Sequence, residues 1–379
     1  MFSSSALRRP TPRTVDRRQL LALAASSVAF AGCPLSVPSM PPGGDSAVPT
    51  GDADGPDELG LLIDRVRSVL DRERLSRGLS TELHGAWQIF HGILAYGKAF
   101  QVDTPSGRVP ALQYFADGGL CPGFRPVLGD ALTDPASSGR GIRVDLQAET
   151  KIGQGHRDQW LAVVTQAGLN LDSDWIVDGH RLRIADWLRQ AEWDVPRNYE
   201  AEFSWTLIPL SLLRPTDHAW VARDGMTYST EDLLGIECQQ EPAESVCGGT
   251  HRLIGIATAV NRRMKEQKPM TGVWAEAKGR LMEAIELARS NQNPDGSYST
   301  AYMHRGGWCQ DLGEVLGTTG HVLEFLAMAG EDDLLRSSWV RRSVQHLCDV
   351  LDRCQGVDLE CGVLYHALHG LSEYQRRMA

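Results

Sequence analysis

The sequence predicts an all-α protein, an α/α toroid of about six helical hairpins. Two observations support this prediction. Short segments that are apolar on every side recur along the chain at helical spacing, and more polar segments with a helical period lie between them. An inner ring of buried helices inside an outer ring of amphipathic ones produces this alternation. An array of helices that does not close into a ring is the alternative architecture.

The first 33 residues are typical of a targeting signal rather than of a folded domain. Arg17 and Arg18 form a twin-arginine pair, an apolar stretch covers 20–31, and two small residues precede Cys33. The segment resembles a bacterial lipoprotein signal of the twin-arginine type. This resemblance implies cleavage before Cys33, acylation of that residue, and a mature protein anchored to a lipid bilayer of the bacterial cell envelope, on its periplasmic or extracellular side. An uncleaved membrane helix is the alternative, but the apolar stretch is shorter than the ~18 to 20 residues that a span requires.

Residues 34–56 predict a flexible, disordered tether, because they are rich in Pro, Gly, Ser and Asp and poor in residues that could build a core. The toroid domain is therefore expected to cover 57–379. The net charge of the chain is −10, and the first 33 residues carry five Arg against one Asp, so that their removal leaves about −14. A chain this acidic is not expected to bind nucleic acid.

The apolar segments are expected to be the inner helices of the toroid. They begin at His84, Gly155, Phe203, Thr250, Thr319 and Cys361. The amphipathic segments, which are expected to be outer helices, include 59–74, 273–292 and 332–353. Because the inner helices of a toroid run parallel to one another, their amino termini meet at one mouth of the barrel. Side chains near the starts of these segments are therefore expected to lie close together.

Four histidines are candidates for an acid–base site at this mouth. His84, His156, His251 and His321 are each predicted to lie in the first turn of an inner helix. The amino end of a helix carries partial positive charge, which lowers the pKa of a nearby imidazole and favours the neutral form that serves as a base or a metal ligand. Glu324, one turn after His321, would add a carboxylate on the same helix face. The alternative for each histidine is a core residue that hydrogen-bonds to a carbonyl group.

The stretch CGGTH leads into the helix that contains His251. Gly248 and Gly249 allow a tight turn before this helix, and Thr250 is expected to cap it. The amino end of such a helix also attracts anions, which favours an anionic or carbohydrate ligand at the mouth. His91 lies two turns into its own helix and is predicted to be a core residue.

The motif QNPDGSY contains Gln292, Asp295, Gly296 and Tyr298. It resembles the repeat of Gln, an acidic residue, Gly and an aromatic residue found in the terpenoid cyclase and prenyltransferase superfamily of α/α toroids. The resemblance implies that these four residues are structural and clamp an outer helix to the next inner helix. The D-x-D-D motif of the cyclases is absent from the sequence, so cyclisation is not implied. The motifs CGGTH and QNPDGSYST together are also similar to those of a family of uncharacterised exported proteins of planctomycete-type bacteria, and this likeness implies export but no activity.

Seven cysteines follow Cys33, and export would allow disulfides between them. The sequence also offers candidate zinc ligands, because Cys309 and Asp311 occupy a loop expected just before the inner helix of His321, and His251 or His321 could complete the site. The toroid superfamily supports this interpretation by resemblance, since its prenyltransferases bind zinc through Asp, Cys and His. The alternative is that Cys247 and Cys309 form disulfides.

These observations leave three hypotheses about function. The first is an enzyme, a hydrolase or lyase that acts on a carbohydrate or an anionic substrate at the barrel mouth through histidine and carboxylate groups. The second is a non-catalytic binding or scaffold lipoprotein that uses the toroid as a rigid surface. The third is a zinc-dependent toroid enzyme. Converging histidine and acid groups would favour an enzyme, and a mouth filled by apolar side chains would favour a scaffold.

Overall fold

Helices make up most of the chain that the computed structural model describes, namely residues 56–132, 139–148, 150–198 and 202–379. The strands within these residues are short. The largely helical fold predicted from the sequence is therefore confirmed. The targeting segment with Cys33, and the predicted tether up to residue 55, lie outside the described residues.

Six helices form the interior, and each corresponds to one of the apolar segments of the sequence. They are α2 (Ala86–Tyr96), α4 (Gln159–Gln166), α6 (Ser204–Leu213), α8 (Thr250–Lys265), α10 (Leu312–Ala329) and α13 (Cys361–Met378). Neighbours in chain order pack against each other from α2 to α13, and α13 packs against α2. The series of contacts therefore returns to its starting helix, which leaves a shared centre toward which all six helices can direct side chains.

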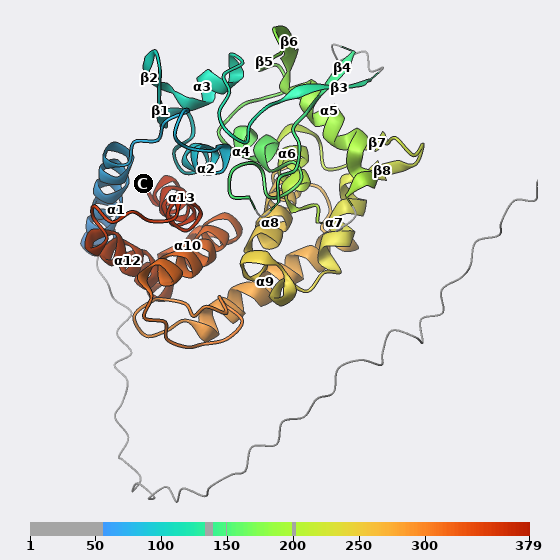
Figure 1. The fold of residues 1–379 in the computed structure, drawn as a ribbon. Helices are drawn as coiled ribbons and strands as arrows, with labels where there is room; N and C mark the ends of the chain where they lie inside the picture. The colour runs from blue at the N-terminus through green and yellow to red at the C-terminus, as the bar shows by residue number, and fades with distance from the viewer. Residues whose placement is uncertain (1–55, 133–138, 149, 199–201) are drawn as a thin grey trace, which may run out of the picture. The chain divides into compact units, whose positions relative to one another are not determined.

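A second set of helices lies outside the first, as Figure 1 shows. These are α1 (Pro56–Ser76), α3 (Ala111–Ala116), α5 (Ile184–Asp194), α7 (Thr230–Cys238), α9 (Val273–Asn291) and α12 (Ser338–Arg353), with the short α11 (Asp332–Arg336) before α12. Each of the six longer members precedes one interior helix in the chain. α12 is the clearest amphipathic case, because its buried residues recur at helical spacing while charged residues occupy its other face.

Four two-stranded antiparallel hairpins complete the described fold, and the sequence analysis did not predict them. They are β1 (Gln101–Thr104) with β2 (Gly107–Pro110), β3 (Val127–Ala131) with β4 (Arg140–Arg143), β5 (Asp174–Val177) with β6 (His180–Arg183), and β7 (Ala219–Val221) with β8 (Thr227–Ser229). The second strands β2, β6 and β8 each run directly into an outer helix, α3, α5 and α7 respectively. The hairpins are thus a repeated addition to the outer layer and leave the centre to the helices.

The QNPDGSY motif begins where the outer helix α9 ends. The Nε2 group of Gln292 donates hydrogen bonds to the carbonyl of Trp339 at 2.7 Å and to Oγ of Ser343 at 2.9 Å, both on α12. Tyr298 is fully buried, and its backbone amide donates to Oγ1 of Thr319 on α10 at 3.1 Å. The motif therefore connects the end of α9 to the inner helix α10 and to the outer helix α12.

Asp295 and Gly296 form the turn of this motif. Oδ1 of Asp295 accepts hydrogen bonds from the backbone amide and the hydroxyl of Ser297, at 3.0 and 2.7 Å. Gly296 has a φ of +89°, which glycine adopts without strain, and its carbonyl accepts a 2.7 Å hydrogen bond from Oγ of Ser343. These contacts hold the turn against α12.

Among the described residues, no helix combines the length and the apolar character that crossing a membrane would need.

Candidate functional site

Five histidines from the interior helices meet at the centre of the fold. His91 is on α2, His156 lies just before α4, His251 is on α8, His321 is on α10 and His366 is on α13. The ring centroids of His321 and His366 are 4.0 Å apart, and the ring of His251 lies 5.2 and 5.0 Å from these two rings. His91 extends the group at 5.1 Å from His366, and His156 extends it at 5.7 Å from His251. We call these five residues the histidine cluster.

The cluster is enclosed by the protein. His91, His251, His321 and His366 are each at most 6% exposed, whereas His156 is only partly buried. Burial in a medium of low polarity disfavours the charged imidazolium, so it lowers the pKa of His91 to about 3 and that of His251 well below its ordinary value. Burial and the neighbouring His321 also lower the pKa of His366. These three imidazoles are therefore neutral at pH 7.

Glu324 is the carboxylate of the centre and holds two histidines of α13. Its Oε2 and Oε1 atoms accept hydrogen bonds from Nδ1 of His366 at 2.7 Å and from Nδ1 of His369 at 2.6 Å. Burial by itself would raise the pKa of Glu324, but His366 and His369 lower it well below its ordinary value. Burial would lower the pKa of His369, and the Glu324 carboxylate raises it instead. Glu324 is thus ionised, and it fixes the orientation of the His366 ring.

His251 and His321 carry ring nitrogens without hydrogen-bond partners among the described residues. His321 donates from Nδ1 to the carbonyl of Gly317 at 2.7 Å, which leaves Nε2 unprotonated and unpaired in the neutral ring. Both ring nitrogens of His251 are unpaired. Buried polar atoms in native proteins are nearly always paired, so unpaired ones at this density mark a place where a ligand can bind.

Cys247 stands next to these two histidines, in the turn that precedes α8. One ligating atom from each of Cys247, His251 and His321 lies within 4.8 Å of the others. Burial would lower the pKa of His321, but its interaction with the adjacent Cys247 side chain raises it to about 9.

Two further contacts lead outward from the cluster. Nδ1 of His156 lies 2.9 Å from Oε2 of Glu202, so this carboxylate can orient the partly buried imidazole. On the other side, the rings of Trp87 and His91 are 4.3 Å apart, and Nδ1 of His91 hydrogen-bonds to the carbonyl of Trp87. Trp87 thereby connects the cluster to a cavity at the amino ends of α2 and α13.

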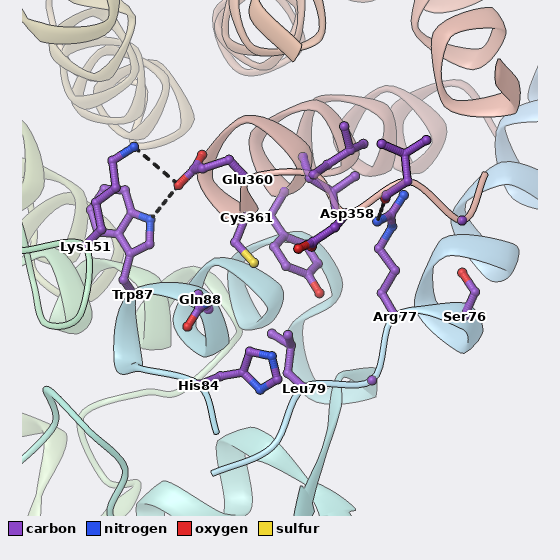
Figure 2. Close-up of a pocket in the computed structure, with 16 residues that line it drawn as sticks. Ser76, Arg77, Leu79, His84, Trp87, Gln88, Lys151, Asp358, Glu360 and Cys361 are labelled. Carbon is purple, nitrogen blue, oxygen red and sulfur yellow. Dashed lines mark hydrogen bonds and ion pairs between the residues drawn. The ribbon is translucent and has the colours of Figure 1, made fainter. Parts of the chain in front are cut away.

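This cavity, which we call the trough, has a volume of about 560 Å³. Figure 2 shows Trp87 and Lys151 both directed toward Glu360. Nε1 of Trp87 donates to Oε1 of Glu360 at 3.3 Å, and Nζ of Lys151 lies 3.7 Å from the same atom. Arg77 and Asp358 also line the trough, so it combines an indole with charges of both signs. Trp87 and His91 lie between the trough and the rest of the histidine cluster.

The structure corrects several details of the predicted site. His84 precedes α2, accepts a 2.9 Å hydrogen bond from the amide of Ser80, and lines the trough instead of joining the cluster. His156 also precedes its helix. His321 lies in the third turn of α10, because that helix begins at Leu312 rather than at residue 319. His91, predicted to be an ordinary core residue, belongs to the cluster.

Thr250 does not cap α8, because it is the first residue of the helix and Gly249 occupies the cap position. Its hydroxyl donates instead to the carbonyl of Cys247 at 2.9 Å. Gly248 and Gly249 have φ angles of +61° and +72°, in agreement with the tight turn predicted from the sequence.

The metal ligands predicted in the loop before α10 are not brought together. The side chain of exposed Asp311 caps α10 by accepting a 3.0 Å hydrogen bond from the amide of Glu314, and Cys309 is half-buried near it. Neither residue joins a group of potential metal ligands in the part of the chain that the structure describes. Of the predicted ligands, only His251 and His321 belong to such a group. The seven cysteines of the described residues are all unpaired.

Sequence reasoning missed Cys247 as a partner of His251, and it missed His366 and His369. A weak signal existed for each. Cys247 lies only four residues before His251, and His366 and His369 are three residues apart, a spacing that places side chains on one helix face.

Comparison with protein-family models, with curated proteins and with solved structures finds no match to this sequence. The function must therefore be argued from the site itself.

Proposed function

We propose that residues 57–379 form an α/α toroid and that the histidine cluster at its centre is the site of a hydrolase or lyase. The toroid is supported by six outer helices that each precede an inner one, and by inner helices whose contacts run in chain order and return to the first. A closed inner ring explains why helices so far apart in the sequence contribute to one site.

The single observation that carries the enzymatic proposal is the convergence of five imidazoles and Glu324 in a buried centre. A scaffold gains nothing from such an arrangement, because each unpaired buried polar group costs about 1 to 3 kcal/mol of stability. Neutral imidazoles beside an ionised carboxylate are, by contrast, the groups that general acid–base chemistry requires.

Two histidine–carboxylate pairs can divide the proton transfers of such a reaction. His366 is oriented by Glu324 inside the cluster, and His156 is oriented by Glu202 on its less buried side. In each pair the carboxylate binds Nδ1, which leaves Nε2 to accept or donate a proton. Because His156 is the more accessible of the two, we assign it the proton exchange with solvent.

The residues that line the trough support the proposal that the substrate is a carbohydrate or an anion. An indole offers an apolar face for a sugar ring, and the carboxylates and cations around Trp87 can hydrogen-bond to hydroxyl or acidic groups. The trough adjoins the cluster through Trp87 and His91, whose rings are in contact. A segment of a polysaccharide bound in the trough would therefore be separated from the acid–base groups by Trp87 and His91, and these two side chains must move for it to reach them.

The test uses two polymeric substrates, purified peptidoglycan and an acidic polysaccharide. Hydrolysis is followed by the release of reducing ends, and elimination by the ultraviolet absorbance of the unsaturated sugar. We expect the wild-type chain to act on one of them and His156→Gln and His366→Gln to lose about 100-fold or more in rate, with unchanged circular dichroism. The control is His180→Gln, at an exposed position on β6. Full activity in both cluster variants, or no activity of the wild type on either polymer, would contradict the proposal.

We also propose that the mature chain is attached to the cell envelope through a lipid on Cys33. The support is the twin-arginine and lipobox-like pattern of the first 33 residues, followed by a Pro-, Gly- and Ser-rich stretch long enough to separate a folded unit from a bilayer. Attachment at the envelope would place the toroid near the polysaccharides that the trough is proposed to bind.

A further inference from the structure

We propose that Cys247, His251 and His321 bind one divalent transition-metal ion, with Zn²⁺ as the expected ion. This inference goes beyond the proposed reaction, because metal binding can be measured without any substrate. It also differs from the zinc site expected from the sequence, since Cys309 and Asp311 take no part.

The first support is distance. The three ligating atoms lie within 4.8 Å of one another. Around a tetrahedral zinc ion, with bonds of about 2.0 to 2.3 Å, neighbouring ligand atoms are roughly 3.3 to 3.7 Å apart. Movement of each side chain by about 1 Å, which rotation about side-chain bonds provides, therefore closes the site.

The second support is the state of the two imidazoles. The Nδ1–H group of His321 donates to the carbonyl of Gly317, so in the neutral ring that metal binding requires the lone pair is on Nε2, the nitrogen without a partner. A histidine that ligates a metal commonly donates its other ring N–H to a backbone carbonyl in this way. The side chain of His251 is only 6% exposed, and neither of its ring nitrogens is paired. A metal ion would satisfy one nitrogen on each ring.

The third support is the backbone that presents Cys247. This residue has a φ of +53°, in the left-handed region that side chains other than glycine rarely adopt. A Cβ atom on Gly248 would lie 2.5 Å from Cγ of Tyr302, and one on Gly249 would lie 2.5 Å from the carbonyl oxygen of Pro242. Both glycines are therefore required by contact as well as by φ.

Hydrogen bonds lock the same turn from both sides. Nε2 of His304 lies 2.8 Å from the carbonyl oxygen of Gly248, and the hydroxyl of Thr250 binds the carbonyl of Cys247. Strained backbone that is fixed by its surroundings is typical of functional sites, where it orients a side chain. Here the strain directs the thiol toward the two unpaired imidazoles.

The donor set identifies the class of metal. One thiolate and two imidazoles favour zinc and its cobalt substitute over magnesium or calcium, which prefer oxygen ligands. Three protein ligands also leave the fourth tetrahedral position for a water molecule or a substrate atom, as in catalytic zinc sites. The ring of His366 lies 4.0 Å from that of His321 and 5.0 Å from that of His251, so it is the nearest further imidazole to the two proposed histidine ligands.

The test is a cobalt titration of the full-length chain, purified in detergent and freed of metal by a chelator. We expect one Co²⁺ per chain, with a thiolate-to-cobalt charge-transfer band and the visible bands of tetrahedral cobalt, and we expect Zn²⁺ to displace it. Cys247→Ser should abolish the charge-transfer band. His251→Gln and His321→Gln should each weaken cobalt binding by about 100-fold or more, at or beyond the range seen when only the supporting partners of metal ligands are lost.

Cys309→Ser is the matched control, because it removes a half-buried thiol from the loop before α10. It should leave the spectrum and the affinity unchanged. The proposal is overturned if wild-type protein shows no charge-transfer band, if Cys247→Ser retains it, or if Cys309→Ser removes it. The wild-type and Cys309→Ser spectra decide the matter even where another variant fails to fold. A chain that binds cobalt as expected but cleaves neither polymer would sustain the metal site and refute only the proposed substrates.

Discussion

The close contact of α10 with α13 gives the sharpest test of how the cluster is built. A Cβ atom on Gly320 would lie 2.6 Å from Cα and 2.7 Å from Cβ of Ala367 on α13. Nearby, a Cβ atom on Gly370 would lie 2.9 Å from the backbone nitrogen of Glu324. Glycine on both helices thus lets their backbones approach, and this approach brings the rings of His321 and His366 to 4.0 Å. We predict that Gly320→Ala destabilises the protein.

The magnitude follows from two opposing effects. Carbon atoms pack best at about 3.5 to 4.0 Å, so the added methyl group forces the helices apart by about 1 Å. Such overpacking costs about 1 to 3 kcal/mol, and the obstacle here is the backbone of Ala367 rather than a flexible side chain. Replacing glycine by alanine within a helix contributes about 1 kcal/mol in the opposite direction.

A control variant separates these effects. Gly279, within α9, has no atom within 4 Å of the position that a Cβ would take, so Gly279→Ala should show only the gain in helix propensity. Urea unfolding followed by circular dichroism should therefore place Gly320→Ala below Gly279→Ala by about 1 to 3 kcal/mol in the free energy of unfolding. Equal stabilities of the two variants would refute the close approach of α10 and α13.

Two other predictions concern protons and the membrane anchor. Burial lowers the pKa of His91 to about 3. Between pH 6.5 and 3 the unfolded chain therefore binds one more proton at this residue than the folded chain does. The free energy of unfolding falls as the pH falls through this window, by about 2 kcal/mol at pH 5. His91→Gln should therefore reduce the loss of unfolding free energy between pH 7 and pH 5 by that amount. The exposed-site variant His180→Gln should leave this loss unchanged. Equal losses in both variants would be evidence against a buried neutral His91. Cys33→Ala should block processing or release the protein from membranes, as immunoblots of fractionated cells would show, and processed, membrane-bound protein in this variant would exclude a lipid on Cys33.

The inner layer could be predicted because each of its helices contains an apolar segment that is buried on nearly every side. Each of the six apolar segments corresponds to a helix, although α10 begins seven residues before the predicted start. The hairpins were missed because strands of three to five residues carry little periodicity. The sequence nevertheless contained one local signal, the Asp-Gly pair at 178 and 179, which favours a tight hairpin turn. In the structure Asp178 and Gly179 have φ angles of +48° and +77°, as such a turn between β5 and β6 requires.

The site could be predicted only in part, for the same physical reason. A helix that is apolar all round has no polar face, so its sequence does not show which side faces the centre. The spacing of His366 and His369 places them on one face of α13, but nothing in the sequence shows that this face meets Glu324 of α10. His84 was expected in the cluster because it starts an apolar segment, but α2 begins two residues later and leaves this side chain in the trough.

The left-handed backbone conformation of Cys247 could not be predicted from the sequence either. It is evidence about the role of the buried histidine cluster. A residue other than glycine in this conformation costs about 1 to 3 kcal/mol, and an unpaired buried imidazole nitrogen costs a similar amount. Both costs meet on three neighbouring side chains, Cys247, His251 and His321. A bound metal would pair the free nitrogens and the thiolate at once, and at a concentration of about 1,000 times its Kd it would add about 4 kcal/mol to stability. Binding of one metal ion where the inner helices α8 and α10 meet would therefore offset both the backbone strain and the cost of the unpaired nitrogens.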